Sequence, residues 1–113
     1  MRFDGDKSAL LDILHNISLA VDFTRDQTFE AFRDDLMRQY AVVRCLEIIS
    51  EASRRLSGEL KQRHPETPWR QMAGAGNIYR HDYEDVAARR IWDTVQKDLP
   101  PLRSVVEREL AEE

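Results

Sequence analysis

Hydrophobic residues recur every three or four positions along most of this chain, which is the spacing of one face of an α-helix. In the first segment, these residues are Leu10, Ile13, Ile17 and Val21. An apolar stripe on one side is typical of a helix that packs against a core. The pattern therefore predicts an amphipathic helix over residues 6–23.

The longest pattern of this kind runs from Leu36 to Leu60, over about seven helical turns. A second apolar row widens its buried face at Ala41, Cys45, Ile48 and Ala52. A helix with so wide a face contacts more than one neighbour, so this segment is predicted to be the central helix. A short helix over residues 29–35 is predicted just before it, because Thr28 is suited to cap a helix N-terminus.

Prolines divide the second half of the chain. Pro65 and Pro68 are predicted to end the long helix and to open a fourth helix over residues 68–81, since proline is well tolerated at the first helical position. A last helix is predicted over residues 86–110. It should kink or break at Pro100–Pro101, because neither residue has a backbone N–H for the helical hydrogen bonds.

Length and composition bound the architecture. A chain of 113 residues is expected to build one hydrophobic core, so residues 1–113 are predicted to form a single domain. No alternation of the kind that marks strands is visible, and short connections favour antiparallel neighbours. The predicted fold is all-α, an up-and-down four-helix bundle with one extra short helix. The Glu-rich end, residues 107–113, is expected to fray.

Charge and hydropathy narrow the location and the partners. Asp12 and His15 interrupt the only early apolar run, so no signal peptide is predicted. No segment approaches the roughly 20 apolar residues of a membrane helix, and we expect a cytoplasmic protein with no membrane contact. The lone cysteine, Cys45, is predicted to be a core thiol. A formal net charge of −4 argues against bulk electrostatic capture of nucleic acid and leaves room for a local basic site.

The residues most suited to chemistry lie between Gly76 and Tyr83. If the helix continues, Asn77 and His81 share one face, with Arg80 one position away. An imidazole can relay protons near neutral pH, and a guanidinium can stabilise a phosphorane. The set suits metal-independent RNA cleavage, and no metal or other cofactor is expected.

A purely structural interpretation of the same segment stays open. Tyr79 would then pack in the core, Asn77 and His81 would cap the helix, and Arg80 and Asp82 would be solvated.

Four blocks, read in order along the chain, resemble a known family. They are FEAFRDD at residues 29–35, VVRCLEIISEA at residues 42–52, PETPWR at residues 65–70, and Asn-x3-His-x-Tyr at residues 77–83. Together they resemble the HepT-like family of HEPN-fold proteins. The resemblance implies a HEPN-like helical homodimer that cleaves RNA, the toxin of a type VII toxin–antitoxin pair whose antitoxin is a minimal nucleotidyltransferase.

The family motif is an arginine, four to six residues, and then His-x-Tyr, which His81 and Tyr83 match. By this resemblance, Tyr83 is also the residue that the antitoxin adenylylates. The arginine is missing, because residues 74–76 are Gly-Ala-Gly. Arg80 lies about 40° round the helix from the last of these, so it can bring a guanidinium to the vacated space. Arg70 is about 16 Å from His81 along a helix, so only a dimer partner's copy is expected to serve.

The candidate site residues are therefore catalytic His81, Arg80, Asn77 and Tyr83, with Arg70 and Arg80 binding RNA. An alternative is a non-catalytic binding companion of a nucleotidyltransferase, in which the same residues bind or accept nucleotide. A third interpretation is a helical dimer in which Trp69 and Trp92 only pack against the second copy.

Overall fold

The computed structural model describes residues 4–78 and 84–112, and the side chains of residues 5–73 and 86–112. No strand occurs within these ranges. The elements, in chain order, are α1 (Asp4–Thr24), α2 (Phe29–Arg33), α3 (Leu36–Arg55), α4 (Gly58–Arg63), α5 (Trp69–Ile78), α6 (Glu84–Asp93), the π-helical turn η2 (Thr94–Asp98) and α7 (Leu99–Ala111). The predicted all-α fold is confirmed.

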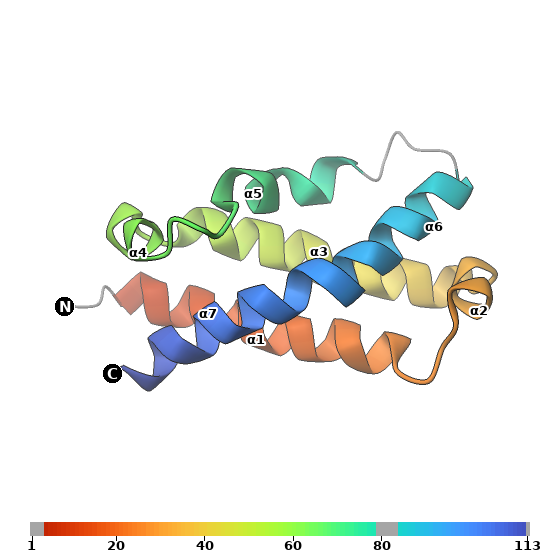
Figure 1. Ribbon diagram of the computed structural model, residues 1–113, viewed down its shortest axis with the longest axis horizontal. Helices are drawn as coiled ribbons and strands as arrows, with labels where there is room; N and C mark the ends of the chain where they lie inside the picture. The colour runs from red at the N-terminus through yellow and green to blue at the C-terminus, as the bar shows by residue number, and fades with distance from the viewer. Residues whose placement is uncertain (1–3, 79–83, 113) are drawn as a thin grey trace.

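The long helices run up and down, as predicted. Figure 1 shows α1 and α3 lying antiparallel, with α5 beside α3 and the continuous α6–η2–α7 segment crossing in front. The short helices α2 and α4 close opposite ends of the bundle. None of the described helices is long and apolar enough to cross a membrane.

The core forms where the apolar stripes of α1, α3 and α7 meet. Its fully or almost fully buried members include Leu10, Ile13, Ile17, Val42, Leu46, Ile49, Leu102 and Val106. As predicted, α3 is central, because it packs against α1, α2, α5 and α6. Cys45 is 4% exposed, and burial raises the pKa of its thiol, which confirms a core thiol.

One predicted helix is two helices in the structure. α3 ends at Arg55, where Leu56 adopts an extended backbone with φ −67° and ψ 143°. Ser57 then caps α4, because its Oγ accepts a hydrogen bond from the Leu60 amide at 3.2 Å. The prediction of one helix through Leu60 was therefore wrong. The sequence pattern does not reveal the break, because Leu56 and Leu60 are both buried and keep the apolar spacing across it.

The predicted interruption near Pro100–Pro101 occurs one turn earlier. The Leu99 amide donates to the Thr94 carbonyl, five residues back, which closes the wider ring of the π-helical turn η2. The two prolines then lie in the first turn of α7, where a missing N–H is tolerated.

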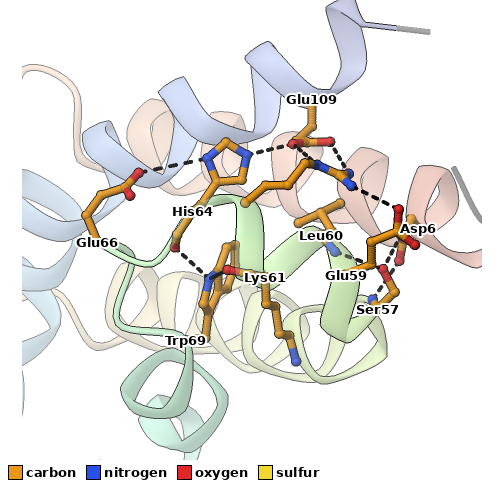
Figure 2. A network of polar contacts seen from close by, with 10 residues as sticks. Asp6, Ser57, Glu59, Leu60, Lys61, His64, Glu66, Trp69 and Glu109 are labelled. Atoms are coloured by element: carbon orange, nitrogen blue, oxygen red, sulfur yellow. Dashed lines mark hydrogen bonds and ion pairs between the residues drawn. The ribbon is translucent and has the colours of Figure 1, made fainter. Parts of the chain in front are cut away.

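A buried carboxylate fastens the start of α1 to the start of α4. Asp6 is 2% exposed and accepts hydrogen bonds from the Ser57 amide at 2.7 Å and the Ser57 hydroxyl at 2.6 Å (Figure 2). We expect Asp6→Ala to lower the free energy of unfolding by about 2 kcal/mol, because it leaves two donors without their partner. Urea unfolding followed by circular dichroism measures this loss.

The matched control is Asp12→Ala on the same helix. The Asp12 side chain is 49% exposed, and its ion pair with Arg55, at 2.7 Å, lies in solvent. Its loss should change the free energy of unfolding by less than about 1 kcal/mol. Equal effects of the two substitutions would contradict a clamping role for Asp6.

Candidate functional site

The predicted catalytic segment lies in the chain between α5 and α6. Arg80, His81 and Tyr83 are outside the described residues. Asn77 belongs to the last turn of α5, of which the backbone is described. Arg70 is exposed near the start of the same helix. The convergence of these side chains on one substrate therefore stays a prediction, and what the structure does describe is how α5 and α6 are held.

The start of α5 is fixed by its tryptophan. The indole Nε1 of Trp69 donates to the carbonyls of Lys61 at 3.2 Å and His64 at 3.1 Å, as Figure 2 shows. Trp69 and Met72 also pack against the core. Trp69 therefore packs within its own protomer, and its contacts fix the start of α5.

The middle of α5 is tied to α3 through one backbone carbonyl. Ser50 donates from its hydroxyl to the Ala73 carbonyl at 2.6 Å, and Arg54 donates from Nη1 to the same oxygen. The Arg54 guanidinium also lies 3.5 Å from the Ser50 hydroxyl. In a regular helix, the Ala73 carbonyl also receives the amide of Asn77. Two polar residues of α3 therefore hold the turn that carries Asn77.

Aromatic contacts hold α6 against α2. The Trp92 ring lies 5.5 Å from the Phe32 ring and 6.3 Å from the Phe29 ring, measured between centroids. The Arg89 guanidinium lies 3.7 Å above the centre of the Phe29 ring, a cation–π contact. Arg89 also lies 4.0 Å from Asp93. This arginine is thus engaged within its own protomer.

A cavity of about 790 Å³ lies between α5 and the η2–α7 segment. Its apolar lining includes Leu46, Ile49, Met72, Leu99, Leu102 and Val105. Cationic side chains such as Arg90 and Lys97 line it together with anionic ones such as Asp93 and Asp98. Sequence reasoning missed this cavity, because its residues come from distant segments and share no motif.

A buried ionic cluster joins α7 to the end of α4. Glu109 is 2% exposed, accepts from Arg63 Nη2 at 2.9 Å and Nε at 3.2 Å, and lies 2.6 Å from His64 Nε2. The hydrogen bonds from Arg63, and then that from His64, lower the pKa of Glu109 to about 2. The carboxylate is therefore ionised at neutral pH and can only accept, so His64 Nε2 carries the proton.

Figure 2 shows His64 between Glu109 and Glu66, whose carboxylate lies 3.8 Å from His64 Nδ1. The expectation of fraying was wrong for residues 107–111, because α7 continues to Ala111 and buries Glu109. Helical spacing in the sequence could not predict that Glu109 pairs with Arg63 and His64, because these residues lie 46 and 45 positions earlier in the chain. The cluster is part of the framework that supports α5, since the His64 carbonyl also accepts from Trp69.

Among the side chains within the described ranges, no group of three or more His, Cys, Asp or Glu residues is placed to hold a metal ion.

The fold and this placement of α5 and α6 define an all-α, HEPN-like protein. A model of the family described as "Ribonuclease HepT-like" matches residues 13–109, so the chain belongs to that family. This result confirms the resemblance seen in the four sequence blocks.

Several curated proteins are similar to this chain over most of their length. "Probable ribonuclease HepT" of Thermococcus cleftensis is 43% identical over 90% of this chain and 93% of that protein. "Putative RNase MJ1380" of Methanocaldococcus jannaschii is 37% identical over 89% of this chain and 93% of that protein. "Putative RNase TTE0752" of Caldanaerobacter subterraneus is 35% identical over 89% of this chain and 90% of that protein. No solved structure matches the chain closely enough to count as a relative.

Proposed function

We propose that this protein is a metal-independent endoribonuclease that acts as a homodimer. The observation that carries the proposal is membership of the ribonuclease HepT-like family over residues 13–109, together with His81 and Tyr83 at the positions of the family motif. The similar proteins from three organisms, each named as a ribonuclease, support the same activity.

In the proposed reaction, the nucleophile is the 2′-hydroxyl of the RNA itself. His81 removes its proton, O2′ attacks the adjacent phosphorus, and the bond from phosphorus to O5′ breaks as His81 returns the proton to the leaving O5′. Arg80 stabilises the charge on the phosphorane, and Asn77 and Tyr83 orient the ribose and phosphate. The products are a 2′,3′-cyclic phosphate and a 5′-hydroxyl. The reaction is therefore atom-balanced without a metal and without added water.

The substrate cleft would lie between two copies of the chain. In that arrangement, the partner's Arg70 binds a phosphate, and Arg70 is exposed near the start of α5. A local cationic surface of this kind compensates for the acidic net charge.

The proposed biological role is that of a toxin in a type VII toxin–antitoxin pair in the cytoplasm. The antitoxin would be a minimal nucleotidyltransferase that silences the toxin by adenylylation. The Tyr83 phenol would attack the α-phosphorus of ATP, form a phosphodiester with adenylate and release pyrophosphate. The added charge and bulk, two residues from His81, would then exclude RNA.

A second candidate function is a non-catalytic companion of a nucleotidyltransferase. The absence of arginine from residues 74–76 favours it, because that arginine belongs to the family's motif. The two functions predict different behaviour of the isolated protein toward RNA.

We expect the purified protein to cleave end-labelled RNA in the presence of EDTA and to leave 2′,3′-cyclic phosphate ends. Arg80→Ala should slow the reaction about 10- to 100-fold, because the phosphorane loses its guanidinium. Denaturing gels of the labelled products, with phosphatase resistance of the 3′ end, provide the measurement.

Arg25→Ala is the matched control, since Arg25 is 64% exposed at the end of α1 and pairs with Asp22. It should cleave at the wild-type rate. Intact RNA after incubation with folded wild-type protein would overturn the ribonuclease proposal for the substrates used and favour the companion function.

A further inference from the structure

Residues 74–76, where the family's arginine is missing, follow a residue of α5 that is contacted by an arginine of α3. Residues 74–76 are Gly-Ala-Gly, so no side chain of that turn carries a charge. Arg54, on α3, donates from Nη1 to the carbonyl of Ala73, the residue just before this turn. Because a helical carbonyl points toward the C-terminal end of its helix, the Arg54 guanidinium lies alongside the turn from Ala73 to Asn77.

Arg54 still has donors to offer a ligand. A guanidinium carries five N–H donors in a planar fork, and one is directed at Ala73. The residue is exposed, and within the described part of the chain its polar contacts are with Ser50 and Ala73, neither of which is charged. By contrast, the adjacent Arg55 forms an ion pair with Asp12 at 2.7 Å.

A second exposed arginine lies on the same helix as this turn. Arg70, three residues before Ala73, is exposed and, within the described ranges, has no ion pair in the structure. Arg54 therefore contacts α5 at Ala73, and Arg70 is an exposed residue of α5 itself, three positions earlier along the chain. Uncompensated guanidinium groups on an acidic protein favour an anionic ligand, and their planar fork matches a phosphate.

We propose that Arg54 binds an RNA phosphate beside the Ala73–Asn77 turn and so supplies the cation that residues 74–76 lack. The inference rests on the proposed function, since it assigns a phosphate-binding residue to the same site.

Arg54 could instead serve only to dock α5 on α3, because it shares the Ala73 carbonyl with Ser50. Ser50→Ala separates the two roles: it removes a hydrogen bond to the same carbonyl at 2.6 Å and keeps the positive charge. A docking role predicts similar losses for Ser50→Ala and Arg54→Ala. A phosphate-binding role predicts a large loss of RNA affinity for Arg54→Ala alone.

The experiment measures binding rather than cleavage. The probe is a short fluorescein-labelled oligouridylate with methylated 2′-hydroxyls, titrated by fluorescence anisotropy at several salt concentrations. We expect Arg54→Ala to weaken binding about 10-fold and to reduce the salt slope by about 0.7, the value for one lost phosphate contact on a single strand. Arg54→Lys should keep the salt slope, because it keeps the charge.

Arg55→Ala is the matched control and should bind as the wild type does, and thermal unfolding by circular dichroism establishes that every variant is folded. If the wild type binds and Arg54→Ala binds equally well, or if Ser50→Ala loses as much, the role of Arg54 is overturned while the ribonuclease proposal stands. If the wild type neither binds nor cleaves RNA, the proposed function is overturned and this inference with it.

Discussion

His81→Ala is expected to lower the rate of RNA cleavage by at least about 100-fold. General acid–base catalysis by a positioned side chain contributes about 10²- to 10⁴-fold, and alanine removes the only imidazole of the motif. His81 is outside the described residues and lies between α5 and α6, each of which is held by its own packing contacts. We therefore expect unchanged helix content and thermal stability. Initial rates on end-labelled RNA in EDTA, with circular dichroism of the same samples, test both statements.

His15→Ala is a matched control for this substitution. His15 is exposed on α1 and belongs to none of the contacts that hold α5 or α6. Its variant should cleave RNA at the wild-type rate. Equal cleavage by wild type and His81→Ala would show that the activity belongs to another residue or to a contaminating nuclease.

Glu109→Gln is expected to destabilise the fold by about 3 kcal/mol at pH 7. The folded-state pKa of Glu109 is about 2, against an ordinary value of 4.5. Each unit of that difference corresponds to about 1.4 kcal/mol of stability in the ionised form. Because the folded pKa is the lower one, this stability is fully present above about pH 4.5 and disappears as the pH falls toward about 2.

The measurement is urea unfolding of wild type and Glu109→Gln at several pH values between 7 and 2.5. The wild type should lose more stability across the acid range, so that the two curves converge at low pH. Glu107→Gln is the control on the same helix: its side chain is 58% exposed and lies 4.0 Å from Arg103, so its loss should cost less than about 1 kcal/mol. A constant offset between the two curves would assign the effect of Glu109 to packing rather than charge.

The main architecture could be predicted because it follows from spacing within single helices. Leu10, Ile13 and Ile17 are buried on one face of α1, and Cys45 is buried on α3, as their periodicity predicts. The short helix predicted over residues 29–35 from its cap is present as α2 (Phe29–Arg33), and the Thr28 hydroxyl accepts a hydrogen bond from the Ala31 amide at 3.1 Å. Such features depend on neighbours three or four residues away, so the chain itself displays them.

What could not be predicted depends on contacts between distant segments. Glu109 looked like part of a solvated, Glu-rich end, and only the packing of α7 against α4 buries it beside Arg63 and His64. The pairing of Arg54 with Ala73 likewise joins residues 19 positions apart on different helices. For the predicted catalytic residues, the sequence supplied the residue types and the family match, and it supplied no distances between the side chains.

The π-helical turn η2 changes the direction in which the apolar stripe of the last helical segment faces. The buried positions Ile91, Val95, Leu99 and Leu102 keep helical spacing through the turn, as if the helix were straight. A π-helical turn holds about one extra residue, and each residue advances a helix by about 100°, so the apolar stripe swings round the axis at η2. One continuous stripe thereby faces α2 and α3 along α6, and α1 along α7. The last quarter of the chain can therefore cover two sides of the bundle without a connecting loop.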